Sequence, residues 1–231
     1  MDNETASITV SALSGNTTEM GGTATFTVVL DSQPTSDVSI AVRSSDTSEA
    51  TISPSSLTFG SSNYSTLQTV TVTGVDDFYG DDNVSYTITV DSSSSIASYN
   101  TMTSSTVTGS NIDNDTAAIT VGAKSGNTSE FGTTATINVT LATIPTANVC
   151  IVVTDNDSTE VSITPTTLTI TPSTCNTTNQ VTLTGQDDSD NDSNITFRIS
   201  FDNATSTDSK YNGMAPSPSY LDVINVDDYA D

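Results

Sequence analysis

Apolar and polar residues alternate with a period of two along several short stretches of this chain. The clearest stretch covers residues 23–30, where Ala24, Phe26, Val28 and Leu30 alternate with threonines and Val29. Because successive side chains of a β-strand point to opposite faces, this alternation predicts strands with one buried face rather than helices. Similar patterns predict six further strands, at residues 7–12, 38–42, 52–59, 69–75, 84–90 and 105–112.

The chain contains this pattern twice, at an offset of 111 residues. Thr69-Val70-Thr71-Val72-Thr73-Gly74 leads to Asp76-Asp77, and Val181-Thr182-Leu183-Thr184-Gly185 leads to Asp187-Asp188. A repeat of this length predicts two domains, at residues 1–115 and 116–231, each large enough to bury its own core. About seven short strands per repeat, separated by turn residues, favour an all-β fold of two tandem immunoglobulin-like antiparallel β-sandwiches.

The charge of the chain is strongly negative. Four Lys and Arg residues stand against 28 Asp and Glu residues, which gives a formal net charge of −24. This charge repels nucleic acid and anionic membranes and attracts metal cations, so we expect neither nucleic-acid binding nor membrane insertion. No apolar run is long enough to span a bilayer. The composition, rich in Ser and Thr, is typical of an extracellular or cell-surface protein.

The chain offers few residues for chemistry other than cation binding, and we expect no enzyme. It has no His, so a Ser or Thr nucleophile has no evident base, and paired carboxylates cannot be told apart from metal ligands. The two cysteines, Cys150 and Cys175, both lie in the second repeat, and the sequence leaves open whether they form a disulfide. Asn-x-Ser/Thr sequons recur, but their use depends on a host that glycosylates.

Most acidic residues fall in segments that we expect at one end of each sandwich. If each strand runs antiparallel to the one before it, the connections after the first, third and fifth strands and the exit of the last strand share one end. In the first repeat these segments contain Glu19, Asp46, Glu49, Asp76, Asp77, Asp81, Asp82, Asp113 and Asp115. In the second repeat they contain Glu130, Asp155, Asp157, Glu160, Asp187, Asp188, Asp190, Asp192, Asp227, Asp228 and Asp231.

Such crowding favours a bound cation, because neighbouring carboxylates raise one another's pKa values and oppose folding. Ca²⁺ fits best, since it takes about 6–8 oxygen ligands from flexible loops and needs neither nitrogen nor sulfur. Zinc is disfavoured in a chain with no His and only two Cys. Mg²⁺ is an alternative, although it retains more water. A further interpretation is that these residues are turn formers on an acidic, soluble surface.

Four segments of the first repeat carry a family resemblance. They are Thr18-Glu19-x-Gly21-Gly22-Thr23-Ala24-x-Phe26-x-Val28, Ser45-Asp46, Val75-Asp76-Asp77 and Ile112-Asp113-Asn114-Asp115. With them the chain resembles tandem Calx-β domains of the bacterial extracellular type, sandwich modules that also occur in sodium/calcium exchangers and in integrin β4. The resemblance covers both repeats and implies a calcium-binding β-sandwich.

The resemblance also implies a set of calcium ligands. Calcium-binding members take them from a Glu after the first strand, an Asp between the third and fourth strands, the acidic loop after the fifth strand and an acidic run after the last. Those positions hold Glu19, Asp46, Asp76, Asp77, Asp81, Asp82, Asp113 and Asp115 in the first repeat, and Glu130, Asp157, Asp187, Asp188, Asp192, Asp227 and Asp228 in the second. The exit runs, Asp-Asn-Asp and Asp-Asp-Tyr, depart from the consecutive acids of strong binders.

We therefore expect a calcium-binding structural repeat of a large secreted or cell-surface protein, such as a stalk or an adhesin. Its expected partners are calcium ions and neighbouring repeats or subunits of the same kind. Because Asp113 and Asp115 also belong to the linker between the repeats, bound calcium is expected to stiffen the junction. Two alternatives are an assembling subunit of an extracellular filament, which would use exposed edge strands, and a regulatory calcium sensor, which would need a partner domain.

Overall fold

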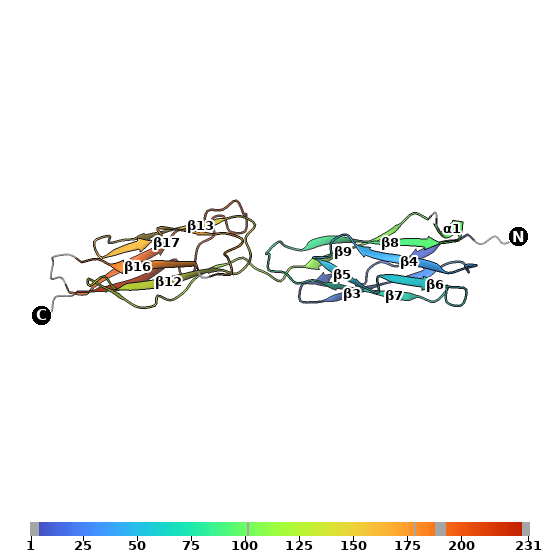
Figure 1. The fold of residues 1–231 in the computed structure, drawn as a ribbon, viewed down its shortest axis with the longest axis horizontal. Helices are drawn as coiled ribbons and strands as arrows, with labels where there is room; N and C mark the ends of the chain where they lie inside the picture. The colour runs from blue at the N-terminus through green and yellow to red at the C-terminus, as the bar shows by residue number, and fades with distance from the viewer. Residues whose placement is uncertain (1–4, 101, 178, 188–192, 228–231) are drawn as a thin grey trace. The chain divides into compact units, whose positions relative to one another are not determined.

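The computed structural model describes residues 5–100, 102–177, 179–187 and 193–227. By its internal contacts the chain divides into two compact units, Met1–Asp77 with Asp81–Asn114, and Phe78–Gly80 with Asp115–Asp231. Both are built almost entirely from strands (Figure 1).

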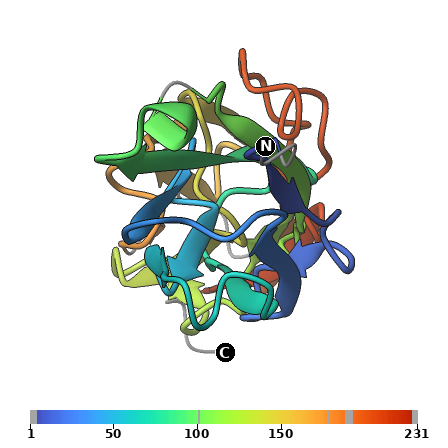
Figure 2. The same ribbon diagram turned by 90° about the vertical axis from the view of Figure 1, so that its right-hand side faces the viewer.

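The first unit contains nine strands and one short helix among its described residues. The strands are β1 (Ile8–Val10), β2 (Thr17–Thr18), β3 (Thr23–Leu30), β4 (Val38–Ser44), β5 (Ala50–Ser53), β6 (Ser56–Phe59), β7 (Gln68–Gly74), β8 (Val84–Ser94) and β9 (Ser105–Ile112). The helix α1 (Ala97–Asn100) packs beside β8 (Figure 2). One sheet has the strand order β1-β3-β7-β5 and the other β2-β9-β8-β4-β6. All pairs are antiparallel except β2 with β9, which are parallel.

The second unit repeats this topology. Its strands are β10 (Ile119–Val121), β11 (Thr128–Ser129), β12 (Thr134–Leu141), β13 (Val149–Asp155), β14 (Val161–Thr164), β15 (Thr167–Ile170), β16 (Asn179–Gly185), β17 (Ile195–Phe201) and β18 (Tyr220–Val226). Its sheets have the orders β10-β12-β16-β14 and β11-β18-β17-β13-β15. As in the first unit, the two-residue strand β11 pairs in parallel with the last strand.

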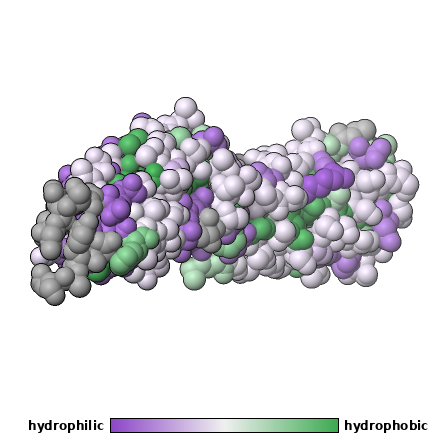
Figure 3. Space-filling model, turned by 60° about the vertical axis from the view of Figure 1, so that its left-hand side comes forward, coloured by the Kyte–Doolittle hydropathy of each residue, from purple (hydrophilic) through white to green (hydrophobic). Residues whose placement is uncertain are grey.

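The alternating apolar residues form a separate core in each unit. In the first, Phe26 on β3 lies opposite Val70 on β7, and Val42 on β4 lies opposite Val90 on β8. All four are buried. The second core forms in the same way around strands β12, β13, β16 and β17. The outward positions are mostly polar, so the surface in Figure 3 is largely of intermediate hydropathy, with small hydrophilic and hydrophobic patches.

The prediction of an all-β, sandwich-type fold is confirmed, and two details of it were wrong. Residues 52–59 were expected to form one strand, but β5 and β6 belong to different sheets, with Pro54 between them. No strand was predicted at residues 17–18, but they form β2 at the edge of the second sheet. These two differences raise the number of strands from about seven to nine among the described residues of each unit.

Both cysteines are free thiols, Cys175 buried and Cys150 partly exposed on β13. Among the described residues, no helix has the length and the apolar character that crossing a membrane would require.

Candidate metal centre

The acidic segments of the first repeat, residues 1–115, meet in two groups of three carboxylates. They come from the turn after β2, the β4–β5 connection, the β7–β8 loop and the segment after β9. Glu19, Asp113 and Asp115 form the first group, which we call trio 1, and Glu49, Asp77 and Asp81 form the second, trio 2. Within each trio, one carboxylate oxygen of every residue lies within 4.8 Å of those of the other two. This spacing suits oxygen ligands of a common cation.

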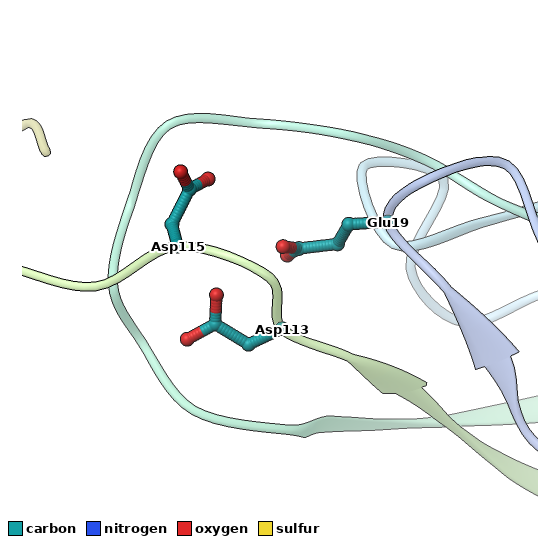
Figure 4. A group of neighbouring side chains, drawn as sticks. All are labelled: Glu19, Asp113 and Asp115. Atoms are coloured by element: carbon teal, nitrogen blue, oxygen red, sulfur yellow. The ribbon is translucent and has the colours of Figure 1, made fainter.

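Trio 1 is built around a buried glutamate. Figure 4 shows the carboxylates of Glu19, Asp113 and Asp115 around a common space, Glu19 pointing into it from the turn that follows β2. Glu19 is 2% exposed, and its Oε2 accepts a hydrogen bond from the amide of Asn114 at 3.0 Å. The amide of Asp82 donates to Oδ2 of Asp113 at 2.8 Å. The main chain thus orients two of the three carboxylates.

Burial raises the pKa of Glu19 to about 7. The negative charges of Asp113, Asp77 and Asp81 also contribute to this raised pKa, whereas the hydrogen bond from Asn114 opposes it. Asp113 belongs to trio 1, whereas Asp77 and Asp81 belong to trio 2, so the charges of both groups act on Glu19. A cation bound there would favour the ionised carboxylate.

Trio 2 contains a second buried glutamate, Glu49, which is 5% exposed. Its Oε2 accepts a hydrogen bond from Nδ2 of Asn111 at 3.3 Å. Burial raises the pKa of Glu49, and nearby Asp81 and Asp77 raise it as well, against the lowering effect of Asn111. Burial and Asp77 likewise raise the pKa of Asp81.

The other expected ligands of the first repeat lie outside both trios. The carboxylate of Asp46 accepts hydrogen bonds from the hydroxyl and the amide of Ser48, which lower its pKa. Asp76 is exposed, and its Oδ1 accepts a bond from Nδ2 of Asn114 at 3.4 Å. Asp82 contributes its main-chain amide to Asp113, from a backbone with φ of 67°. The negative charge of Asp46 also contributes to the raised pKa of Glu49 in trio 2.

In the second repeat, part of the expected ligand set lies outside the described residues, namely Asp188, Asp192 and Asp228. The described part keeps the pattern of the first repeat. Glu130 is 5% exposed, like Glu19. The amide of Ser193 donates to Oδ2 of Asp227 at 2.9 Å, as Asp82 does to Asp113.

The two remaining expected ligands of the second repeat also correspond to residues of the first. Asp157 accepts hydrogen bonds from the hydroxyl and the amide of Thr159, which matches Asp46 with Ser48. Asp187 is exposed, as Asp76 is. The described residues of the second repeat therefore repeat these local contacts, whereas both groups of three carboxylates found among the described residues lie in the first repeat.

The expected ligand set omitted two pairs of residues that the structure brings to this end. Glu49 and its counterpart Glu160 are buried, and each bonds an asparagine, Asn111 or Asn225. The glutamates could have been found from the sequence, because they recur at the 111-residue offset three positions after Asp46 and Asp157. The asparagines carry no charge, and only their recurrence at a different offset of 114 residues marks them.

Comparison with known proteins finds solved structures that are similar to this chain at low sequence identity. No protein-family model matches the chain, and no curated protein matches it. The structure of CBD12 from CALX1.2 is similar at 13% identity, over 84% of this chain and 79% of that chain, with a TM-score of 0.36. Domains 5–6 of the S-layer protein SbsC are similar at 18% identity, over 96% of this chain and 98% of that chain, with a TM-score of 0.30.

A third similar structure is the CsuC–CsuE chaperone–tip adhesion subunit pre-assembly complex from archaic Csu pili of Acinetobacter baumannii. It matches at 7% identity, over 64% of this chain and 81% of that chain, with a TM-score of 0.36. At these identities the likeness concerns the all-β fold alone.

Proposed function

We propose that the acidic end of each sandwich binds calcium, and that the chain is a structural repeat of a secreted or cell-surface protein. The observation that carries the proposal is the pair of carboxylate trios, Glu19 with Asp113 and Asp115, and Glu49 with Asp77 and Asp81. Six carboxylates from four separate segments converge in a protein of net charge −24 with no His. Oxygen donors of this kind favour Ca²⁺ over Zn²⁺, and their number favours Ca²⁺ over Mg²⁺.

Calcium would also act on the chain segment between the two repeats. Asp113 and Asp115 lie between β9 and β10, so an ion that binds both carboxylates would restrict the backbone there. The function that follows is mechanical, a spacer or stalk that is stiffer with calcium than without it. The negative surface and the polar outward positions of the strands suit such a role outside the cell.

Thermal unfolding of the whole chain tests the proposal, in calcium-free buffer, in about millimolar calcium and in magnesium. A ligand that binds only the folded state stabilises it by about 2.7 kcal/mol at 100-fold over Kd. We expect a clear rise of Tm that calcium produces more strongly than magnesium. The double variant Asp77→Asn/Asp81→Asn should reduce this rise, while Asp37→Asn, at an exposed acid outside both trios, should not.

The outcomes separate the parts of the proposal. Equal Tm values with and without calcium would reject calcium binding. A calcium-dependent Tm with identical small-angle scattering curves in the two conditions would reject the stiffening of the segment between the repeats. An equal rise of Tm in magnesium would show that the site binds divalent cations without preference for Ca²⁺.

A further inference from the structure

Asn111 is a neutral, buried residue in contact with the candidate metal centre. It lies on β9 and is 1% exposed. Its Nδ2 donates to Oε2 of Glu49 at 3.3 Å and to the carbonyl oxygen of Val75 at 2.9 Å. Because a carbonyl accepts but never donates, the bond to Val75 fixes which end of the amide faces Glu49. One side chain thus holds both the glutamate of trio 2 and the start of the loop that carries Asp77 and Asp81.

The other end of the amide is also held. Oδ1 of Asn111 accepts from the hydroxyl of Thr17 at 3.0 Å, and Thr17 Oγ1 lies 3.1 Å from the hydroxyl of Tyr86 in the core. The strand β7 makes room for this side chain with a glycine, since a Cβ at Gly74 would overlap Oδ1 of Asn111 and the carbonyl oxygen of Thr18. A chain of hydrogen bonds therefore runs from the core to Glu49.

The second repeat contains the same arrangement. Asn225 on β18 is 2% exposed, and its Nδ2 donates to Oε2 of Glu160 at 3.1 Å and to the carbonyl oxygen of Gln186 at 3.1 Å. Gly185 leaves the space that Gly74 leaves in the first repeat. The same pair of bonds from an asparagine is therefore present in both repeats.

We propose that Asn111 and Asn225 are positioning residues of the two calcium sites, which hold the carboxylates of Glu49 and Glu160 toward the bound ion. The inference rests on the proposed calcium function. Outer residues that orient a metal ligand by a hydrogen bond commonly change metal affinity by about 10–100-fold when they are replaced. An Asn is suited to this role because it donates to a carboxylate without adding negative charge to the site.

The hydrogen-bond networks of Asn111 and Asn225 differ by one hydroxyl group. The counterpart of Tyr86 at the 111-residue offset is Phe197, which has no hydroxyl. The hydroxyl of Thr128 donates to the carbonyl oxygen of Ile224 at 3.3 Å, and Oδ1 of Asn225 has no hydrogen-bond partner among the described residues. The glutamate of the second repeat is therefore held by a less complete network than that of the first.

Calcium titration calorimetry of the intact chain tests the inference, with Tm in calcium-free buffer as the measure of folding. Asn111→Ala should weaken calcium binding at the first repeat by about tenfold or more. Asn179→Ala is the matched control, because Asn179 is also buried but donates to the carbonyl oxygens of Thr174 and Thr177 in the β15–β16 connection. It should lower Tm and leave the calcium affinity unchanged.

Two milder variants keep the test decisive if Asn111→Ala does not fold. Tyr86→Phe removes only the hydroxyl that completes the first network and should weaken calcium binding several-fold, whereas Phe197→Tyr should strengthen binding at the second repeat. Calcium affinities equal to wild type in all folded variants, with only Tm altered, would overturn the positioning role while leaving calcium binding intact. A wild-type chain that binds no calcium would instead overturn the proposed function, and the inference with it.

Discussion

Buried carboxylates dominate the candidate site at the scale of single residues. Glu19 and Glu49 are 2% and 5% exposed, although glutamate is among the residues that proteins bury least often. Each accepts a hydrogen bond, from the amide of Asn114 or the side chain of Asn111. One such bond offsets only part of the cost of burying a charge. Their ionised forms therefore need a further positive partner, which a cation would supply.

The raised pKa of Glu19 predicts how stability depends on pH in calcium-free buffer. Its pKa is about 7 in the folded protein and near 4.5 when unfolded. Between these values the folded state binds a proton that the unfolded state has lost, so the free energy of unfolding should fall as pH rises from about 4.5 to 7. Glu49 and Asp81, whose pKa values are also raised, act in the same direction.

Urea unfolding at pH 5 and pH 7.5 measures this dependence. Glu19→Gln, which keeps the shape but cannot ionise, should flatten it. Saturating calcium should oppose the trend, because the ion competes with the proton for the same oxygens. A calcium-free protein that is equally stable or more stable at pH 7.5 would contradict the assignment.

At the scale of elements, strands with strict alternation were the easiest to predict. On β3, Ala24, Phe26, Val28 and Leu30 are all buried, as the pattern indicated. The pattern was less informative where a strand is short or changes sheet. Residues 52–59 show alternation across Pro54, but the chain leaves one sheet after Ser53 and enters the other at Ser56. Alternation reports which face is buried and does not report which strand lies alongside.

Two adjacent positions on β12 test whether only one face of this strand packs in the core. Ile137 is fully buried opposite Val181, and Asn138 next to it is exposed. We expect Ile137→Ala to lower the free energy of unfolding by about 2–5 kcal/mol through the cavity it leaves. Asn138→Ala should change it by less than about 0.5 kcal/mol. Denaturant unfolding of both variants provides the comparison, and similar losses from the two would show that the strand is not packed on one face.

At the scale of the whole molecule, repulsion among the many negative charges opposes folding. Only four Lys and Arg residues offset 28 acids. Arg43 forms an ion pair with Asp91 and Arg198 forms one with Asp222, and both pairs are largely exposed. Exposed pairs of this kind contribute little, about 0–1 kcal/mol each. Mutual repulsion of the remaining acids therefore acts mostly unopposed in the absence of cations.

Screening of this repulsion predicts the response to salt. In calcium-free buffer, Tm should rise as sodium chloride increases from about 0.02 to 0.5 M, because the Debye length falls well below the spacing of distant charges. With calcium bound the rise should be smaller, since the ions have already neutralised the most crowded carboxylates. Thermal scans at matched ionic strengths measure both trends. A Tm that is independent of salt would show that repulsion does not limit stability.

Periodicity and repetition in the sequence determined the class of fold and the places where acids gather. The side-chain period of a strand is a local property, and acids that follow a strand must lie at its end, so Glu19, Asp77 and Asp113 could be assigned to one end of a sandwich. The tertiary structure decided which of them meet. Asn111 reaches Glu49 across 62 residues of sequence, while Asp46 turns to its own neighbour Ser48. Such contacts depend on which strands pair and on which side chains the pairing buries, and that information is distributed over the whole chain.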